Sequence, residues 1–271
     1  MRGVALVLVT LGVVVLLYAG HELYGTGVAS DRAQQTASRL LEQEWATPTG
    51  VVPTADDAPR HGEPVARIRI PALGPDWSYT VREGTDEDVL ADGPGHYTGT
   101  ALPGEAGNVA IAAHRVGHGA PFDGLGTLAG CEEVVLETRD RWLVYRVLPD
   151  AATACAGVAA PSGPYAGLVG REVVPPTRTD VIAAVPGRPD LVPDEPAHLL
   201  TLTTCHPRFS ARERLVIHAA LAEGAQVRAG TAATRRPRRR GRGRSRSGRR
   251  RPRARDGRRR RRGGGQPARP G

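Results

Sequence analysis

Lysine is absent from this chain of 271 residues, so all 37 basic residues are arginines. Together with the abundance of Ala, Gly and Pro, this absence indicates a genome of high G+C content and not a selected chemistry. Aromatic residues make up only 4% of the sequence, so aliphatic side chains must fill the core. The hydrophobic content of 40% is sufficient for one ordinary domain with additional segments. The sequence contains no internal repeat.

Acidic residues are almost absent from the end of the chain, which makes the overall charge misleading. From Arg235 to Gly271 there are 19 arginines and one acidic residue, Asp256, a net charge of +18. Residues 1–234 carry 18 arginines and 27 acidic residues, a net charge of −9. The folded part is therefore acidic. Residues 229–271, which have few apolar side chains, are predicted to form a disordered, arginine-rich tail.

Charge is also missing from residues 3–20, GVALVLVTLGVVVLLYAG. A helix of this length spans roughly 27 Å, about the thickness of a bilayer core, so residues 1–21 are predicted to be a single transmembrane anchor. A cleaved signal peptide and a buried core helix are the alternatives. Against the signal peptide, the positive region is minimal and no clear A-x-A site follows the apolar run. Arg2 predicts a cytoplasmic N-terminus and an extracellular remainder.

The middle of the chain divides into a connecting segment and a folded region. Residues 22–64 are predicted to be a stalk and linker, with a polar helix or stalk at 28–46 and a flexible stretch rich in Pro at 47–64. Residues 65–228 contain short apolar runs bounded by Gly and Pro, and about seven or eight strands at this spacing predict an all-β antiparallel barrel or sandwich. The runs lie at 65–73, 108–114, 133–137, 142–148, 180–185, 198–205 and 214–221.

A cysteine and an arginine lie at facing ends of two predicted strands, in TLTTCHPRFSARERLVIHAAL (201–221). If Cys205 ends one strand and Arg214 begins the next, antiparallel pairing places them side by side. A nearby positive charge favours the thiolate, which is the nucleophile, and the same guanidinium can stabilise negative charge on a carbonyl oxygen under attack. The alternative is a buried small side chain beside a solvated charge at a strand end.

Nucleophilic catalysis by a cysteine also needs a base, and histidine is the natural candidate. His114 ends the apolar run NVAIAAH, so a strand can hold it rigidly at the same kind of rim as Cys205. It is favoured over His96, which lies in a Gly-rich loop. His206 follows Cys205 directly and should point to the opposite face, and His218 lies inside a strand, where a packed histidine is expected.

These residues resemble a known family. TLTTC, followed nine residues later by the arginine of RLVIHA, is similar to the sortase signature, and NVAIAAHR resembles the histidine strand of that family. The stretch from ARIRIPALGPDW to the loop after His114 resembles the class E branch of actinobacteria, and the similarity covers roughly residues 65–225. Ala113 departs from the pattern, because glycine is expected there, and its methyl group could crowd the site.

The resemblance implies a closed eight-stranded sortase-type β-barrel with short helices, preceded by the transmembrane helix, and a cysteine transpeptidase activity. Cys205 would attack the Thr–Gly carbonyl of an LAxTG- or LPxTG-like sorting signal, His114 would transfer protons, and Arg214 would stabilise the oxyanion. The implied partners are surface proteins with a C-terminal sorting signal and an amine acceptor such as lipid II or peptidoglycan. No cofactor and no metal is expected. The sequence leaves open the natural substrates and the choice between housekeeping and pilin-joining roles.

Two features lie outside this catalytic pattern. Cys131 and Cys155 flank a predicted hairpin at 133–148, so a disulfide closing its open end is feasible outside the cytoplasm; two separate thiols are the alternative. The arginine-rich tail could neutralise phosphates. Because the chain is expected outside the cell, no nucleic acid is expected as partner, and an anionic wall polymer or the membrane surface fits better.

Two other functions are alternatives to this interpretation. An L,D-transpeptidase also uses Cys and His, but its Ser-x-Gly-Cys motif is missing here. A non-catalytic module that binds cell wall or polyanions on a sortase-like barrel is the second alternative. The presence of all three polar groups argues against it.

Overall fold

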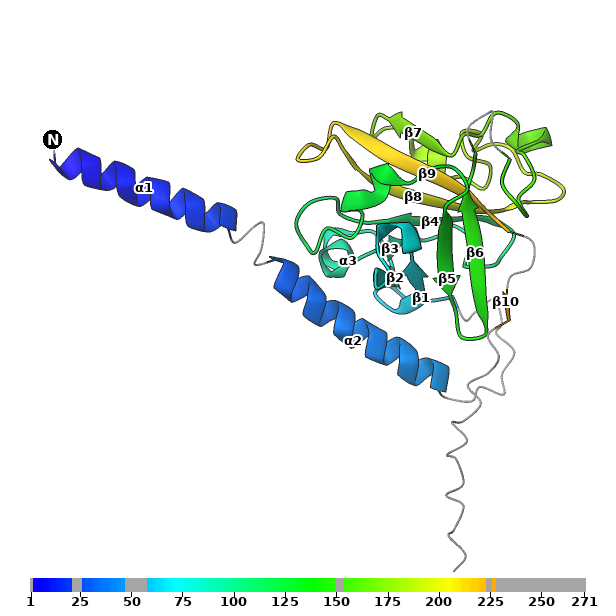
Figure 1. Cartoon of the computed structure of the whole chain (residues 1–271), viewed down its shortest axis with the longest axis horizontal. Helices are drawn as coiled ribbons and strands as arrows, with labels where there is room; N and C mark the ends of the chain where they lie inside the picture. Colours follow the sequence, from blue (N-terminus) through cyan, green and yellow to red (C-terminus); the bar gives the residue numbers. More distant parts are fainter. Residues whose placement is uncertain (1, 21–25, 47–57, 150–153, 223–225, 228–271) are drawn as a thin grey trace, which may run out of the picture. The chain divides into compact units, whose positions relative to one another are not determined.

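The computed structural model describes residues 2–20, 26–46, 58–149, 154–222 and 226–227 (Figure 1). The contacts of the chain divide it into two units, residues 1–231 and 232–271. The second unit lies outside the described residues, and so does the whole of the predicted tail at 229–271. The predicted linker is described only from residue 58 onward.

The described strands form one sheet that closes into a barrel (Figure 1). Eight strands make the ring, in the order β6–β5–β1–β2–β3–β4–β8–β9, and pairing of β9 with β6 closes it. The predicted eight-stranded β-barrel is thus confirmed. Short strands β7 and β10 extend the sheet beside β9 and β6. The bounds of the strands are β1 Pro64–Arg69, β2 Ser78–Glu83, β3 Gly95–His96, β4 Gly107–Ala112, β5 Glu133–Glu137, β6 Arg141–Val147, β7 Arg171–Val174, β8 His198–His206, β9 Glu213–Leu221 and β10 Gln226–Val227.

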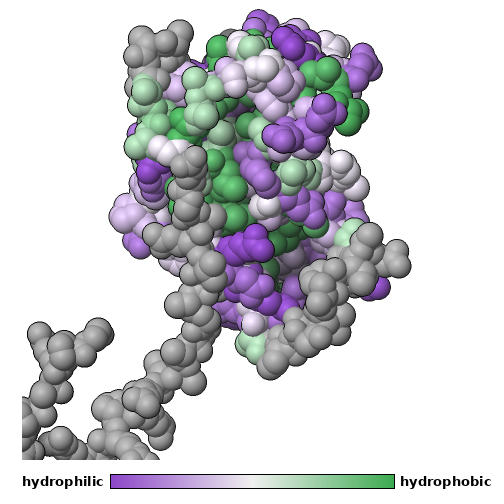
Figure 2. All heavy atoms as spheres, turned by 90° about the vertical axis from the view of Figure 1, so that its right-hand side faces the viewer, coloured by the Kyte–Doolittle hydropathy of each residue, from purple (hydrophilic) through white to green (hydrophobic). Residues whose placement is uncertain are grey.

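Alternating side chains separate the interior of the barrel from its outer face. Successive residues of a strand point to opposite faces, and the large apolar cluster takes every second residue of each central strand. Aliphatic side chains provide most of this cluster, as the low aromatic content requires. Its members include Val109, Ile111, Leu200, Leu202, Leu215, Ile217 and Ala219. Figure 2 shows one outer side of the molecule, where hydrophilic residues cover much of the lower part and apolar and hydrophilic residues are interspersed above.

Two sequence predictions about the strands need correction. Residues 180–185, predicted as a strand, instead include the 3-10 helix η6 at Thr179–Ile182. Its Val181 packs with Val174 and Val216 on the outer side of β9, so the apolar residues cover the barrel and do not join it. The pairing is also not purely antiparallel, because β2 pairs with β3 and β4 pairs with β8 in parallel.

Two long helices precede the barrel in sequence, α1 at Arg2–Gly20 and α2 at Thr26–Ala46. Among the described residues, no helix combines the length and the apolarity that crossing a membrane requires. The predicted transmembrane helix is therefore without support from the structure. Short helices within the domain are α3 at Glu87–Asp92 and the 3-10 helices η3 at Pro71–Leu73, η4 at Asp123–Thr127 and η5 at Gly163–Tyr165.

The helix α2 packs against the barrel, which the prediction of a stalk did not anticipate. Leu41 and Ala37 are buried. The side chain of Gln34 accepts a hydrogen bond from the Thr80 backbone N–H at 2.7 Å and donates to the Asp92 carbonyl at 2.9 Å. Since a glutamine side chain here satisfies backbone groups of β2 and α3, α2 is a covering element of the domain.

The disulfide that the sequence left open is present. Cys131 and Cys155 are bonded, and the Cys131 backbone N–H donates to the Val147 carbonyl at 2.9 Å, at the open end of the β5–β6 hairpin. The bond closes a loop across a sequence separation of 24 residues. It leaves Cys205 as the free cysteine of the chain, whose sequence contains three cysteines in all.

Candidate active site

Strand register brings the three predicted catalytic residues into one row across three neighbouring strands. In the parallel pairing of β4 with β8, Ala112 lies opposite Thr203. The ladder continues beyond β4, because the Ala113 N–H donates to the Thr203 carbonyl at 3.2 Å and the Thr204 hydroxyl donates to the Ala113 carbonyl at 2.8 Å. Two residues further along this register, His114 comes level with Cys205.

The third position in the row is set by the β8–β9 hairpin. Its antiparallel register pairs Cys205 with Arg214, as the sequence predicted. Alternation then assigns a common face. Val109 and Ile111 of β4, Leu200 and Leu202 of β8, and Leu215 and Ile217 of β9 belong to the interior cluster. His114, Cys205 and Arg214 fall on the other parity in all three strands and so belong to the outer face.

A cleft of about 260 Å³ lies at this edge of the barrel. Both His114 and Cys205 line it, and both are partly exposed. The end of β4 and the loop between β8 and β9 therefore form its walls. The other lining residues are Arg115, Val116, Phe209, Ser210 and Ala211.

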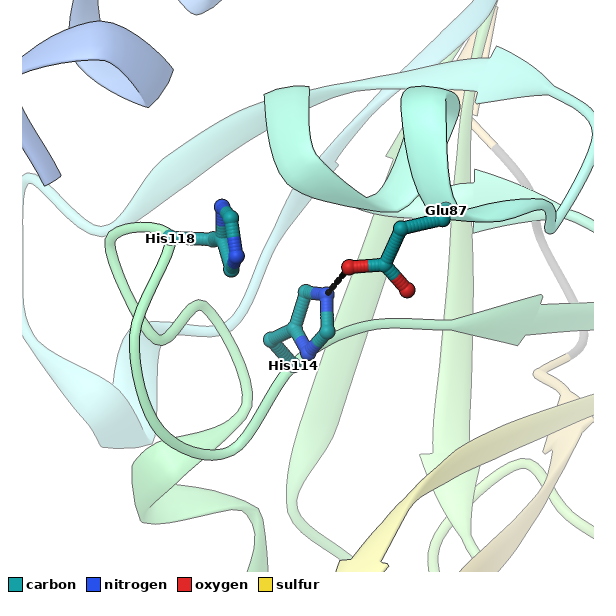
Figure 3. Close-up of side chains that lie close together, drawn as sticks. All are labelled: Glu87, His114 and His118. Carbon is teal, nitrogen blue, oxygen red and sulfur yellow. Dashed lines mark ion pairs between the residues drawn. The ribbon is translucent and has the colours of Figure 1, made fainter. Parts of the chain in front are cut away.

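His114 is surrounded by two further polar side chains (Figure 3). Its Nε2 lies 3.9 Å from an oxygen of Glu87, and its ring stacks on that of His118 with the centroids 4.7 Å apart. Burial lowers the pKa of His114 below its ordinary value, and the neighbouring His118 lowers it further, while Glu87 acts in the opposite direction. The neutral imidazole is therefore favoured, which suits a residue that must accept a proton.

Arg214 has the predicted register but not the predicted contact. Its guanidinium donates to the backbone carbonyls of Ala211 at 3.2 Å and Glu213 at 3.1 Å. It is not among the residues that line the cleft. In this structure it supports the loop that follows Cys205, whereas the sulfur and the imidazole open into the cleft.

The sequence analysis missed Arg115, which lines the cleft directly after His114. Its guanidinium donates to the backbone carbonyl of Cys205 at 3.2 Å and contacts the Nδ1 of His206 at 2.8 Å. Arg115 thus ties the end of the histidine strand to the end of the cysteine strand. The only signal in the sequence was its position next to His114, and an arginine at a strand end is usually solvated.

Most other histidines have structural partners. His96, the rival candidate, is buried and bonded to Glu83, and His218 is buried between Thr201 and Glu172. His198 contacts the Glu105 carbonyl and His61 pairs with Asp86, while His21 lies outside the described residues. The preference for His114 over His96 is thus consistent with where each ring lies.

Ala113, the departure from the expected glycine, does not crowd the cleft. Its side chain is buried in the interior cluster of the barrel, whereas His114 belongs to the opposite face. The extra methyl group adds to the core.

Comparisons with known proteins agree with this geometry. The family model described as Sortase domain matches residues 68–222. The Streptomyces coelicolor sortase SrtE2 is 31% identical over 220 residues, which cover 78% of this chain and 77% of that relative. Sortase SrtE1 of the same organism is 28% identical over 232 residues, covering 82% of this chain and 57% of that relative. These two relatives confirm the class E resemblance.

Among solved structures, the sortase SrtF from Corynebacterium diphtheriae matches with a TM-score of 0.60 and 37% identity. The match covers 68% of this chain and 97% of that structure. A sortase D5 transpeptidase from Clostridium perfringens, at 20% identity and a TM-score of 0.52, shares the fold. Barrel, cleft and relatives lead to one conclusion: the chain belongs to the sortase family and is a cysteine transpeptidase.

Proposed function

We propose that this sortase cleaves an LAxTG- or LPxTG-like sorting signal between Thr and Gly and joins the Thr carboxyl group to a cell-wall amine. Cys205 would act as nucleophile and His114 as general acid and base. The observation that carries this proposal is the register of β4, β8 and β9, which brings residues 114, 205 and 214 level on one face. The cleft shared by His114 and Cys205 supports it.

The reaction would proceed in two balanced steps. The Cys205 thiol gives its proton to neutral His114 and the sulfur bonds to the Thr carbonyl carbon. The Thr–Gly C–N bond then breaks, and the leaving amine takes that proton from His114. The acceptor amine then attacks the thioester carbonyl and gives its proton to neutral His114, and the thiolate leaves. The same imidazole therefore protonates the leaving amine in the first step and deprotonates the acceptor amine in the second.

The two arginines would have different roles. Arg214 remains the proposed group for the oxyanion and the substrate backbone. This requires its guanidinium to exchange two backbone carbonyls of the loop for the substrate when a peptide enters. Arg115 is proposed as a positioning residue, because it holds the Cys205 carbonyl directly. Hydrogen-bond donors that are in place before the substrate binds are more effective in catalysis than donors that must rearrange. Arg115 is already in place, whereas Arg214 must rearrange.

We also propose that the catalytic domain works outside the cytoplasm, where lipid II or peptidoglycan offers an amine. The Cys131–Cys155 disulfide supports an oxidising compartment. Membrane attachment through residues 3–20 is supported by their uncharged, largely apolar sequence. Fractionation of cells producing the full chain, compared with a chain that begins at Thr26, tests the attachment.

A fluorogenic peptide assay tests the proposed reaction. The wild-type chain should cleave an LAxTG or LPxTG peptide, and with an added amine it should form the joined product. Cys205→Ala should lose the activity by more than about 10³-fold, as removal of a catalytic nucleophile does. Mass spectrometry of the wild type should reveal an acyl adduct on Cys205. Equal cleavage by the two proteins would contradict the proposal.

A further inference from the structure

Three side chains from three different segments meet around His114, which also lines the cleft (Figure 3). Glu87 comes from the first turn of α3, His114 from the end of β4, and His118 from the loop after it. Each offers an atom that can bind a metal ion, and these atoms all lie within 4.8 Å of one another. In the described part of the chain, this is the one group of at least three such residues.

The Nε2 of His114 faces this group without a hydrogen bond. The atom is buried and has no hydrogen-bond partner among the described residues, and the nearest Glu87 oxygen is too far away at 3.9 Å. A buried nitrogen with no partner is uncommon in a folded protein and asks for an explanation. The Nε2 of His114 points toward Glu87, and His118 lies beside the same ring (Figure 3).

The position of His118 is fixed by contacts outside the cleft. Its backbone N–H donates to the hydroxyl of Thr26 at 3.1 Å, at the start of α2. Its ring stacks on that of His114. Glu87, by contrast, is exposed and can move its carboxylate by rotation of its side chain. Two imidazoles are therefore already held together, and a flexible carboxylate can complete the set.

We propose that Glu87, His114 and His118 form a site for a divalent transition metal ion of the Zn²⁺ class, and that the ion inhibits the enzyme reversibly. Two imidazoles and one carboxylate are a known three-ligand set for zinc, with a fourth position left for water. Nitrogen ligands favour such ions over Ca²⁺ and Mg²⁺, which prefer oxygen.

Inhibition is expected because one of the three metal ligands, His114, is also the proposed general acid and base. A metal ion on the Nε2 of His114 occupies the lone pair through which the imidazole accepts a proton. Cys205 keeps its place in the cleft but loses the group that protonates the leaving amine. This consequence rests on the proposed role of His114, whereas metal binding itself does not.

Binding is tested first in a protein without the competing thiol. Isothermal titration of Cys205→Ala with ZnCl₂ should give one site per chain. Adding His118→Ala or Glu87→Gln should weaken binding by at least about tenfold, because loss of even an indirect partner costs 10- to 100-fold in metal affinity. Asp88→Asn, on the same helical turn as Glu87, and His198→Ala, a remote and partly exposed histidine, are the matched controls and should bind as Cys205→Ala does.

Two outcomes would overturn the proposal. One is the absence of Zn²⁺ binding by Cys205→Ala, which would indicate that any metal on the wild type needs the thiol. The other is equal binding by the His118→Ala, Glu87→Gln and control proteins. Thermal unfolding of each variant without metal shows whether it is folded, and Glu87→Gln, an exposed change, keeps the test valid if His118→Ala is unstable.

Activity gives the second readout. Peptide cleavage is measured for each variant in Zn²⁺ and in a chelator, and the ratio of the two rates is compared. The rate in Zn²⁺ divided by the rate in chelator should be low for the wild type and close to one for His118→Ala and Glu87→Gln. Adding excess chelator to the Zn²⁺-treated wild type should restore its full rate. If Zn²⁺ binds as described but the ratio stays near one in the wild type, the inhibitory part is wrong. If no protein cleaves peptide in chelator, the proposed function fails and the binding result stands alone.

Discussion

His96 lies in β3 and His114 lies just beyond the end of the neighbouring β4, each near a glutamate, yet their surroundings differ completely. The Nδ1 of His96 lies 2.6 Å from Glu83, and its Nε2 contacts the Ala101 carbonyl and the Thr100 hydroxyl, each at 3.0 Å. The side chain of His96 is 2% exposed, whereas that of His114 is 23% exposed. No hydrogen bond satisfies the Nε2 of His114 within the described residues.

The difference separates a structural histidine from a reactive one. A ring whose two nitrogens are both bonded inside the protein is fixed in place and cannot exchange protons with a substrate. A ring with an unbonded nitrogen beside a cleft contributes less to the stability of the fold, but it can bind a substrate or another ligand that enters the cleft. The contrast therefore predicts that substitutions at the two positions will change different properties.

The largest expected effect is on activity, at His114. The change His114→Ala should lower kcat/KM for a sorting-signal peptide by about 10²–10⁴-fold, the usual contribution of a general acid–base group. It should leave thermal unfolding almost unchanged, because the ring makes few satisfied bonds. Kinetics and calorimetry on the same preparation check both statements. A fully active His114→Ala enzyme would remove this residue from the mechanism.

The reciprocal effect is on stability, at His96. His96→Ala should lower the free energy of unfolding by about 1–3 kcal/mol, because the buried carboxylate of Glu83 loses a partner. Glu83 retains the Thr98 hydroxyl, which donates at 2.6 Å. Denaturant unfolding measures the loss, and activity per folded molecule should stay near that of the wild type. A strong loss of activity without loss of stability would reverse the assignment of the two histidines.

A smaller effect is expected at Arg115, which joins the two catalytic strand ends. Arg115→Leu should lower kcat by roughly tenfold, since misplacing a catalytic group by a fraction of an ångström is costly in rate. KM should change less, because the residue is expected to position Cys205 and not to bind substrate. Arg212→Leu, an exposed change in the loop between β8 and β9, is the control. Equal kcat values for Arg115→Leu and Arg212→Leu would show that Arg115 does not position Cys205.

The smallest effect is a shift in the titration of His114, and its sign differs between two variants. His118→Ala should raise the pKa of His114, because it removes a neighbouring positive charge and uncovers one face of the ring. Glu87→Gln should lower this pKa, because a negative charge that favours the protonated form is lost. Proton NMR titration in chelator follows the ring. Shifts of the same sign in both variants would contradict the described arrangement.

Local patterns in the sequence were sufficient for part of the fold and site. The β8–β9 hairpin was predictable because Cys205 and Arg214 are close in sequence and the strands alternate. The parallel pairing of β4 with β8 was not, because no local signal connects residues about ninety positions apart. The strand-end position of His114 favoured it over His96, but only the family resemblance indicated that its strand lies next to that of Cys205. Glu87 and His118 were not singled out for the same reason, since their proximity exists only in the folded chain.

The missed and misassigned strands have equally physical causes. β3 has two residues, and it pairs through backbone groups that any sequence provides. β2 alternates polar and apolar residues without a clear apolar run. Residues 180–185 are apolar because they cover the outside of the sheet through Val181 and Val185. Hydropathy indicates burial, but it does not say on which side of a sheet the burial occurs.

The Cys131–Cys155 bond has a practical consequence for anyone who handles the enzyme. While it is intact, the chain presents a single titratable sulfhydryl, at Cys205. A stoichiometric alkylating reagent would then count competent molecules directly, one label per working enzyme. More than one label per chain would show that the Cys131–Cys155 bond is reduced in part of the preparation. One assay therefore measures both the fraction of competent enzyme and the fraction of oxidised protein.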